Sequence, residues 1–513
     1  MRVIRACRDM GLASVAVYSK CDRAARHVRM ADEACAIGPN EPAESYLRID
    51  RLLEAARRTH ADAVHPGYGF LAENATFASA CRDAGLTFIG PRPEVITLMG
   101  SKTSARRAAM AAGVPVVPGT EQSFAASDPD SAVASAASRV GYPLLIKAVA
   151  GGGGKGMRLV EGPEDLVSAI RAARSEAGTA FGDSAIYMER RLTRPRHIEV
   201  QLLGDQQGTV VPFVERECSI QRRHQKVIEE TPSPVVSPAL RVGLTSAAAA
   251  VARSVGYTSA GTIEFLVDED GRFWFLEMNT RLQVEHPITE MVTGIDLVEW
   301  QIRIARGEKL DVDPAAAMTP HGHAIECRVY AEDPDAGFFP SAGCITALRV
   351  PGGPWVRDDG GAEAGAEVPI YYDPLISKLA TWGPDRAQAL ARMKRALREY
   401  EVLGIRTTVP FFRWMLDQPA FKTAVFHTGY LDEVLQQRQQ GEHFLTADKE
   451  EEEAAAIVAA LHMASRFERG PSAASRGAAT RVWGGSPAFR RAPEADAGTQ
   501  GWKARGRLEA LRA

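Results

Sequence analysis

Alternating apolar and polar positions mark the stretch from Gly261 to Pro287 as two strands joined by a tight turn. Apolar and aromatic runs flank Asp270-Gly271, a pair typical of a two-residue hairpin loop. With that loop, counting outward along the ladder places Glu264 directly opposite Glu277. Like charges in such positions destabilise a ladder, whereas a divalent cation between them would bind both carboxylates. The pattern therefore predicts a metal site at this hairpin.

The same alternation continues beyond the second strand. We expect the run to stay extended up to His286-Pro287, because the residue before a proline avoids the helical region. A solvated polar face is the ordinary explanation of such a pattern. Two opposed acids beside an amide and an arginine instead favour a metal and phosphate site, if the chain also supplies nucleotide contacts. At strand spacing, one face carries five polar side chains: Glu277, Asn279, Arg281, Gln283 and Glu285.

Helix and strand patterns alternate over residues 1–100, which predicts a parallel, doubly wound sheet. Helical spacing covers residues 2–10, 46–59 and 77–84, and buried strand patterns cover 13–18, 61–65 and 86–89. Such a sheet normally opens with a strand, yet this chain opens inside a helix. We therefore expect that a short N-terminal segment is missing. Ser101 then caps a helix that carries Lys102 near its start.

A glycine-rich run, Gly151-Gly-Gly-Gly-Lys-Gly156, lies between two strand-like segments. Its spacing matches a dinucleotide-binding loop, but a strand follows where that motif requires a helix. It is not a P-loop either, because Met157 stands in the position of the lysine. Two strands joined by glycines predict a hairpin flap whose backbone amides can close over a polyphosphate. Lys147, in the first strand, faces the same region.

The remaining segments predict a third, mixed domain and a tail. A locally basic run from Glu215 to Lys226 lacks interleaved aromatic residues, so it fits a wall around small anions better than a nucleic-acid surface. Short strands and helices follow as far as Leu416. Thr446 is expected to cap an acidic, alanine-rich helix that reaches Ala464. Residues 465–513 have the composition of a linker or disordered segment.

Composition restricts the class of protein. The chain has 513 residues, enough for about two to four domains, and its net charge of −3 gives no field that would recruit nucleic acid or an anionic membrane. Seven scattered cysteines show no ligand spacing, which indicates reduced thiols. No secretory segment or membrane-spanning run is present in the sequence. We therefore expect a cytoplasmic protein with no nucleic-acid or membrane partner.

Four collinear blocks resemble the biotin carboxylases, the ATP-grasp component of biotin-dependent carboxylases, over roughly residues 1–435. The blocks are residues 65–74 (HPGYGFLAEN), 151–157 (GGGGKGM), 217–226 (ECSIQRRHQK) and 277–287 (EMNTRLQVEHP). The resemblance implies a multidomain α/β and α+β fold. It would comprise a Rossmann-like domain at 1–100, an ATP-grasp domain at 101–318 with a glycine-loop lid at about 119–191, and a C-terminal biotin carboxylase domain at 319–435. An acidic helix and a disordered linker would occupy 436–513.

The same resemblance implies roles for individual residues. Two Mg²⁺ or Mn²⁺ ions would be held by Glu264, Glu277 and Asn279. Bicarbonate would be held by Lys226, Arg281, Gln283 and Val284, while Glu285 takes its proton and Arg328 stabilises the enolate oxygen of biotin. ATP would be held by Lys102, Lys147, Gly152, Gly153, Gly154, Glu189, Leu192, His197, Gln221 and His224.

The implied activity is the ATP-dependent carboxylation of carrier-bound biotin by bicarbonate through carboxyphosphate. This is the first half-reaction of acetyl-CoA or propionyl-CoA carboxylase, as in fatty acid biosynthesis. The implied partners are a biotin carboxyl carrier domain, a second copy of the chain and a carboxyltransferase subunit. Alternatives are a ligase of the carbamoyl-phosphate synthase type, which Arg281, Glu285 and Arg328 oppose, and a catalytically inactive nucleotide-binding scaffold. The metal and base positions oppose the scaffold, whereas the expected loss of an N-terminal strand favours it.

The sequence departs from the family pattern at both ends. Members usually begin with a strand and an Asn-Arg-Gly-Glu-Ile-Ala-like segment. We therefore expect that the sequence either folds poorly or is a mis-started fragment. No Ala-Met-Lys-Met biotin-attachment site is present, and Met393-Lys394 lies in an ordinary helical pattern. Residues 502–511 resemble a linker that leads to a biotinyl domain, so the carrier is expected on a removed segment or a separate chain. Acetyl-CoA, propionyl-CoA and pyruvate all remain open as the final acceptor.

Overall fold

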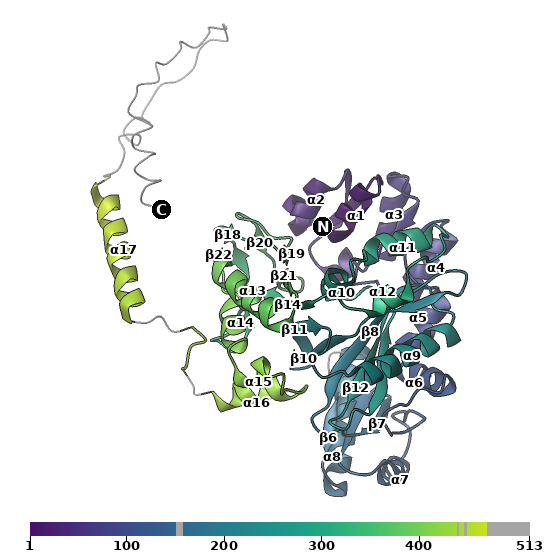
Figure 1. The fold of residues 1–513 in the computed structure, drawn as a ribbon. Coiled ribbons are helices and arrows are strands. Elements are labelled where there is room, and N and C mark those ends of the chain that lie inside the picture. Colours follow the sequence, from purple (N-terminus) through teal and green to yellow (C-terminus); the bar gives the residue numbers. More distant parts are fainter. Residues whose placement is uncertain (150–156, 439–440, 446–448, 469–513) are drawn as a thin grey trace, which may run out of the picture. The chain divides into compact units, whose positions relative to one another are not determined.

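A nine-stranded antiparallel sheet is the framework of residues 1–445 in this computed structural model (Figure 1). The structure describes residues 1–149, 157–438, 441–445 and 449–468. The strand order is β13-β12-β8-β10-β11-β14-β21-β19, and β9 pairs with β8. The nine strands are β8 (Arg196–Gly204), β9 (Val210–Pro212), β10 (Arg216–Arg222), β11 (Gln225–Thr231), β12 (Ser259–Val267), β13 (Phe273–Asn279), β14 (His323–Tyr330), β19 (Val356–Asp358) and β21 (Leu375–Gly383).

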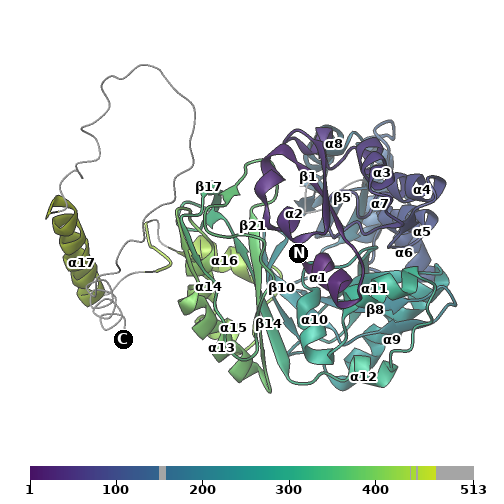
Figure 2. The same ribbon diagram turned by 90° about the horizontal axis from the view of Figure 1, so that it is seen from above.

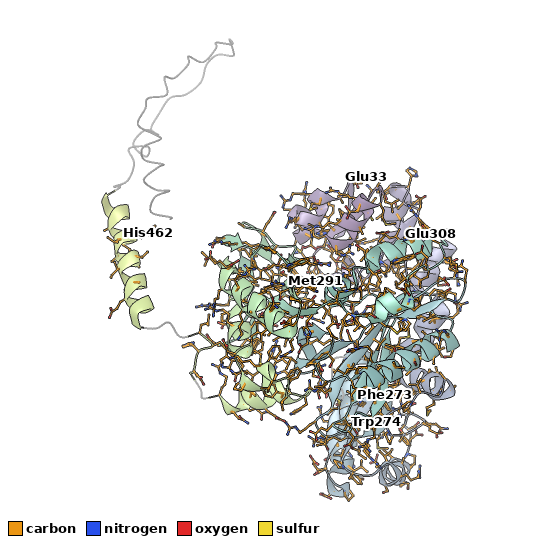
Figure 3. The ribbon with its side chains drawn as sticks, in the orientation of Figure 1. Glu33, Phe273, Trp274, Met291, Glu308 and His462 are labelled. Carbon is orange, nitrogen blue, oxygen red and sulfur yellow. The ribbon has the colours of Figure 1, made fainter. Side chains whose placement is uncertain are left out.

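The β12–β13 hairpin has the predicted register but not the predicted turn. Glu264 lies opposite Glu277, as expected. The loop is longer than two residues, because the backbone N–H of Asp268 bonds to the carbonyl of Arg272, and Gly271 takes a left-handed conformation with φ of +77°. A register shift between Glu264 and Phe265 then restores the expected pairing. Phe273 and Trp274, labelled in Figure 3, open the second strand.

The predicted extension of this strand to residue 285 is wrong. β13 ends at Asn279, and residues 280–285 form no strand. His286 and Pro287 instead begin the helix α10 (His286–Thr293), since a proline in the first turn needs no intrahelical N–H partner. Residues 280–285 therefore form a loop, and their polar side chains are oriented by side-chain partners rather than by a ladder.

The N-terminal residues pair in parallel, as predicted, but in two separate two-stranded sheets, one of β1 with β2 and one of β3 with β4. Residues 15–30 lie beside the segment that contains β19 and β20 (Glu367–Val368) in both views (Figures 1 and 2), where Arg29 pairs with Glu363. The elements are α1 (Arg2–Asp9), β1 (Val15–Ser19), η1 (Lys20–Ala24), α2 (Arg26–Met30), β2 (Glu33–Gly38), η2 (Pro42–Glu44), α3 (Ile49–Arg58), β3 (Ala63–Val64), α4 (Ala75–Asp83), β4 (Thr87–Phe88) and α5 (Pro93–Gly100).

A three-stranded sheet of order β6-β5-β7 contains the two strands that flank the glycine-rich run. β5 pairs antiparallel with β6, as a hairpin requires, while the joining residues 150–156 lie outside the described part of the chain. Helices α7 and α8 supply its core, in which Val133, Ile146 and Ile170 are buried together. The elements are α6 (Lys102–Ala111), α7 (Asp130–Val140), β5 (Leu144–Ala148), β6 (Arg158–Val160), η3 (Pro163–Asp165), α8 (Leu166–Phe181) and β7 (Ile186–Arg190).

Helices cover both faces of the central sheet. Ile325 and Cys327 of β14 pack with α13, whereas Ala324 packs with α10 on the opposite face. Figure 2 shows α13 and α10 on either side of β14. The remaining helices are α9 (Pro238–Ser254), α11 (Leu297–Ala305), α12 (Pro314–Met318), α13 (Arg386–Glu399), α14 (Val409–Met415), α15 (Pro419–Lys422) and α16 (Tyr430–Gln437). Short strands complete this part: β15 (Glu332–Asp333), β16 (Phe339–Pro340), β17 (Gly343–Cys344), β18 (Ala347–Arg349), β20 (Glu367–Val368) and β22 (Glu401–Leu403).

Helix α17 (Lys449–Glu468) confirms the acidic helix but ends later than predicted, so residues 465–468 are helical rather than linker. Its proposed cap, Thr446, and residues 469–513 lie outside the described residues. None of the seven cysteines forms a disulfide in this structure, and the reduced state of the thiols stays a prediction. No helix within the described ranges is long and apolar enough to cross a bilayer.

Candidate active site

Lys226, at the start of β11, is the centre of a buried cluster of carboxylates. Its Nζ donates hydrogen bonds to Glu199 on β8 at 2.6 Å, to Glu264 on β12 at 2.7 Å and to Glu285 at 2.8 Å. All three carboxylates are buried. Glu199 has a second cationic partner, Arg216. The central sheet thus brings three acids from separate segments onto one ammonium group.

The cations of this cluster keep Glu264 and Glu285 ionised. Burial alone would raise the pKa of Glu285, but Lys226, Arg328 and Arg216 outweigh burial and hold it well below its usual range. Burial likewise opposes ionisation of Glu264, and Lys226 with His197 lowers its pKa below the ordinary value. Around Lys226, burial favours the neutral amine, yet the three carboxylates raise its pKa well above the usual range. The site is therefore an ionic one.

Arg328, on β14, lies on the other side of Glu285. Its Nε donates to Oε1 of Glu229 at 2.6 Å, and its Nη2 donates to Oε2 of Glu285 at 2.9 Å. Glu285 is thus held at one oxygen by Lys226 and at the other by Arg328. This arrangement fixes the orientation of the carboxylate and leaves both cations beside it.

Arg281 extends the site along the loop that follows β13. Its Nη1 donates to the amide oxygen of Gln283 at 3.1 Å, and its Nη2 donates to that of Asn279 at 3.2 Å. Glu73 fixes this loop from the N-terminal part of the chain, because its carboxylate accepts from Nε of Arg281 at 2.9 Å and from the backbone of Thr280 at 2.8 Å. Contact with Glu73 replaces the ladder that the sequence pattern had suggested.

Glu264, Glu277 and Asn279, the predicted metal ligands, lie together on the hairpin. Asn279 donates to Oε1 of Glu264 at 2.9 Å. Burial, followed by the charge of Glu264, raises the pKa of Glu277. Two opposed carboxylates and an amide oxygen form an oxygen donor set of the kind that Mg²⁺ and Mn²⁺ bind. These residues therefore fit a divalent cation.

His197 on β8 extends the donor set. Its Nε2 lies 3.2 Å from Oε2 of Glu264. Its Nδ1 lies 3.0 Å from the side-chain nitrogen of Gln221, which also donates to the carbonyl of Cys218. Because the amide nitrogen donates to Nδ1, the proton of a neutral imidazole is on Nε2, toward Glu264. Ligand atoms of His197, Glu199 and Glu264 all lie within 4.8 Å of one another.

Glu189 on β7 joins the three-stranded sheet to helix α6. Lys147 and Arg106 both pair with its carboxylate, Arg106 at 2.5 Å. Although burial opposes ionisation, these two cations lower the pKa of Glu189. The group orders Lys147 on β5, the strand that precedes residues 150–156.

The other predicted residues surround this region. Lys102 is the first residue of α6, and its charge acts on Glu189 and Glu277. Leu192 follows β7 and is half-buried. His224 occupies the β10–β11 turn with a φ of +67°, and burial lowers its pKa. The carbonyl of Val284 accepts from Lys378 at 2.9 Å. Gly152, Gly153 and Gly154 lie outside the described residues.

Sequence reasoning missed several residues that hold the site together: Glu73, Arg106, Glu199, Arg216, Glu229 and Lys378. Two had a usable signal. Glu73 belongs to the block at 65–74, and Glu199 shares the polar face of its strand with His197 and Gln201. The others contact the site through tertiary pairing only. Lys378, for example, is 94 positions from Val284.

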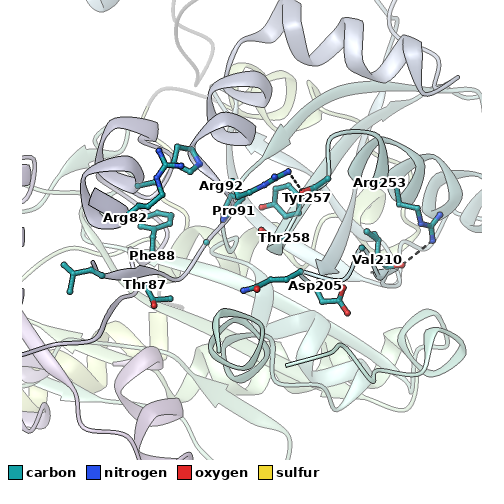
Figure 4. Close-up of a pocket in the computed structure, with 17 residues that line it drawn as sticks. Arg82, Thr87, Phe88, Pro91, Arg92, Asp205, Val210, Arg253, Tyr257 and Thr258 are labelled. Atoms are coloured by element: carbon teal, nitrogen blue, oxygen red, sulfur yellow. Dashed lines mark hydrogen bonds between the residues drawn. The ribbon is translucent and has the colours of Figure 1, made fainter. Parts of the chain in front are cut away.

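A separate cavity of about 690 Å³ lies between the N-terminal part and helix α9 (Figure 4). Arg82, Arg92 and Arg253 line it, together with Asp205 and Tyr257. None of the predicted site residues is among its lining residues. The cavity therefore plays no part in the cluster around Lys226.

Three family models match the chain in succession. They are "Biotin carboxylase, N-terminal domain" over residues 1–96, "Carbamoyl-phosphate synthase L chain, ATP binding domain" over 101–313 and "Biotin carboxylase C-terminal domain" over 326–433. A protein of Nostoc named biotin carboxylase is 50% identical over 434 residues, covering 85% of this chain and 96% of that protein. The chain belongs to the biotin carboxylase family. The fold and the ligase class predicted from the sequence are confirmed.

Other biotin carboxylase relatives belong to enzymes with different acceptors. A pyruvate carboxylase component of Methanothermobacter thermautotrophicus is 52% identical over 433 residues, covering 84% of this chain and 87% of that protein. The alpha chain of mitochondrial methylcrotonoyl-CoA carboxylase from Oryza sativa is 45% identical over 495 residues, covering 95% of this chain and 66% of that protein. The biotin carboxylase domain of Hydrogenobacter thermophilus 2-oxoglutarate carboxylase superposes with a TM-score of 0.82 at 44% identity, covering 87% and 96% of the two chains. That structure is a dimer with MgADP, ADP and bicarbonate.

Proposed function

We propose that this chain uses ATP and bicarbonate to carboxylate the ureido nitrogen of carrier-bound biotin. The observation that supports this most strongly is the placement of Glu285 between Lys226 and Arg328, beside the oxygen donors of the hairpin. A carboxylate held between two cations can take a proton from an anion that those cations bind. A bicarbonate ion is such an anion.

Bicarbonate would be held by Lys226, Arg281, Gln283 and the backbone of Val284. Its negative charge draws Lys226 away from full pairing with Glu285 and adds repulsion, so bound bicarbonate raises the pKa of Glu285. A carboxylate that is a weak base in the free protein thus becomes a better one once the substrate is in place. Substrate binding and base strength are coupled through the same ammonium group.

The adenine of ATP would lie beside Leu192, and its phosphates would be covered by Gly152, Gly153 and Gly154. The other residues that would hold ATP are Lys102, Lys147, Glu189, His197, Gln221 and His224. Glu264, Glu277 and Asn279 would hold Mg²⁺ or Mn²⁺, which would neutralise phosphate charge. Lys147 is already ordered by Glu189, and Arg106 shares that carboxylate. The chain therefore orients its phosphate-binding lysine before the nucleotide arrives.

The chemistry then follows from these contacts. Glu285 takes the bicarbonate proton while a bicarbonate oxygen attacks the γ-phosphorus, and ADP leaves. Carboxyphosphate breaks into CO₂ and phosphate, and the phosphate removes the proton from the biotin nitrogen, which attacks CO₂. Arg328 would stabilise the negative charge on the ureido oxygen. Water must be excluded throughout, because it would hydrolyse carboxyphosphate.

The partners follow from the same proposal. A biotinyl carrier would bring biotin to Arg328, and a carboxyltransferase would receive the carboxyl group. We propose an acyl-CoA acceptor, with acetyl-CoA and propionyl-CoA as the first candidates, and a homodimeric chain. The match to the methylcrotonoyl-CoA carboxylase chain supports an acyl-CoA acceptor: it covers 95% of the present chain and so extends beyond Leu445. Transfer of labelled carboxyl groups to acetyl-CoA, propionyl-CoA and pyruvate, by the carboxylase complex isolated with this chain, distinguishes the acceptors.

The direct test of the proposal is ATP hydrolysis by the purified chain. We expect turnover that requires both Mg²⁺ and bicarbonate and that free biotin stimulates. Chelation of the metal should abolish it, because the opposed carboxylates Glu264 and Glu277 need a cation before they can receive phosphate oxygens. Folded protein that binds ATP but shows no bicarbonate-dependent turnover would instead support a nucleotide-binding scaffold.

Glu73→Gln tests how the loop at 280–285 is held. The substitution weakens the anchor of Arg281, so the KM for bicarbonate should rise by about threefold to tenfold, a modest effect because the pair is partly exposed. The KM for ATP should change much less, since no predicted ATP contact lies on this loop. Steady-state kinetics in each substrate measures both values. Glu94→Gln, which removes an exposed partner of Arg82, is the matched control and should change neither. An equal rise in both KM values would contradict the local role of Glu73.

A further inference from the structure

A second group of carboxylates lies next to Arg328. Glu229 on β11 and Glu326 on β14 are directly opposite in the antiparallel ladder. Arg328 follows Glu326 by two positions, so both side chains are on the same face of the sheet. Lys378 on β21 lies opposite Arg328. Two acids in facing positions are unfavourable when both are ionised.

Glu326 has no partner for either of its carboxylate oxygens among the described residues, although its side chain is fully buried. Glu229 differs, because its Oε1 accepts from Arg328 and only its Oε2 is unpartnered. A buried carboxylate without a cation or donor is far less stable than the neutral acid. Burial raises the pKa of Glu326 well above its usual range, and Glu229 and Glu285 add to this, whereas Lys378 and Arg328 oppose it.

The cations near Glu326 are engaged elsewhere. Lys378 donates to the carbonyl of Val284 and lies 3.8 Å from Asp359. Arg357, opposite Ala380 on the neighbouring strand, pairs with Glu290 and Asp359. Helix α10, marked by Met291 in Figure 3, covers this face with apolar side chains. The charged or titratable groups that act on this region include Lys226, Glu229, Glu285, His286, Glu290, Arg328, Tyr330, Arg357, Asp359 and Lys378.

We propose that Glu326 is a positioning residue that acts as a neutral carboxylic acid and thereby keeps the guanidinium of Arg328 on Glu229 and Glu285. While Glu326 carries its proton, Arg328 has two anionic partners, one on each side. If Glu326 loses the proton, a third carboxylate on the same face competes for one guanidinium. The guanidinium of Arg328 then turns toward the carboxylates of Glu229 and Glu326 and away from Glu285.

Glu229 supports this assignment. Burial raises its pKa to about 7 even though Arg328 lowers it. Glu229 and Glu326 therefore titrate as a pair that holds a proton near neutrality, and the ion pair with Arg328 places the negative charge on Glu229. The proton resides on Glu326, which has no cation of its own. Only the predicted effect of Glu326 on turnover rests on the proposed function.

The alkaline side of the pH profile tests the consequence. In the unmodified chain, biotin-dependent turnover should fall above neutrality as the pair loses its proton. Glu326→Gln cannot lose that proton, so the fall should move upward by about one pH unit or more. Glu332→Gln is the control, because it also removes a largely buried carboxyl, but one that pairs with Arg222 instead of Arg328. The alkaline limb of the pH profile should not move in Glu332→Gln. An alkaline limb that does not move in Glu326→Gln would overturn the proposal.

Infrared spectroscopy tests the protonation itself without turnover. A carbonyl stretching band of protonated carboxyls should be present in the unmodified, folded chain at neutral pH, and the component that Glu326 contributes should be lost in Glu326→Gln. Absence of this band from the unmodified chain would overturn the proposal even if the variant fails to fold. If the unmodified chain lacks bicarbonate-dependent turnover, the proposed function fails, and the infrared result still decides whether Glu326 is neutral.

Discussion

Replacing Glu285 by glutamine is expected to lower bicarbonate-dependent ATP hydrolysis by about 10²–10⁴-fold, the range typical for loss of a general base. Glutamine keeps the size of the side chain but cannot accept the bicarbonate proton. ATP should still bind, because neither oxygen of Glu285 contacts a residue assigned only to the nucleotide. Steady-state turnover and an ATP-induced shift of Tm measure the two effects separately.

The matched control for this substitution is Glu299→Gln on helix α11. Its side chain is 44% exposed and lies 3.8 Å from Arg303, so its ion pair is longer and much more exposed to solvent than those of Glu285. The same chemical change there should leave turnover and Tm unchanged. Turnover by the Glu285 variant within a few-fold of the unmodified chain would contradict the assignment of the base.

Lys226→Met is expected to affect both stability and turnover. The substitution removes the cation that Glu199, Glu264 and Glu285 share. Glu264 then keeps only His197, and the other two acids keep one arginine each. Removal of one partner from a buried ion pair typically costs about 3–5 kcal/mol in the free energy of unfolding. Turnover should be lost as well, since bicarbonate then has no ammonium group to bind. Denaturant titration followed by circular dichroism measures the first effect.

The pH dependence of this loss follows from the charges. Lys226 lowers the pKa values of Glu264 and Glu285 in the folded state, so without it these two acids take up protons more readily as the pH falls. The stability difference between variant and unmodified chain should therefore shrink toward acid pH. Lys394→Met is the control: Lys394 also makes a 2.7 Å ion pair, but its partner Asp417 is 59% exposed. Its cost should be below about 1 kcal/mol, and an equal cost for both variants would contradict the buried cluster.

The sequence alone allowed the hairpin and its pair of acids to be predicted, because strand alternation is a local property. Glu264 and Glu277 face each other although the turn is longer than Asp270-Gly271 suggested, since a register shift compensates for the longer loop. The predicted strand beyond Asn279 failed because alternation cannot distinguish a ladder from a loop held by side chains. Pro287 in fact opens a helix.

The other residues of the site could not be predicted from the sequence, because they meet only through tertiary contacts. Nothing local in the sequence indicates that Glu73 binds Arg281, which is 208 positions away, or that Lys226 joins acids from three segments. The neutral state of Glu326 depends on its burial under α10, which the pattern Ile-Glu-Cys-Arg does not show. The roles of these residues could be assigned only once the register of the central sheet was known.

Fixation of labelled bicarbonate into biotin tests the proposed carboxylation most directly. The purified chain is incubated with ATP, Mg²⁺, free biotin and carbon-labelled bicarbonate, and carboxybiotin is measured beside released phosphate. We expect acid-labile label in biotin that requires ATP and Mg²⁺ and is lost in Glu285→Gln. Phosphate release without any label in biotin, from folded protein saturated with all substrates, would contradict the proposed carboxylation.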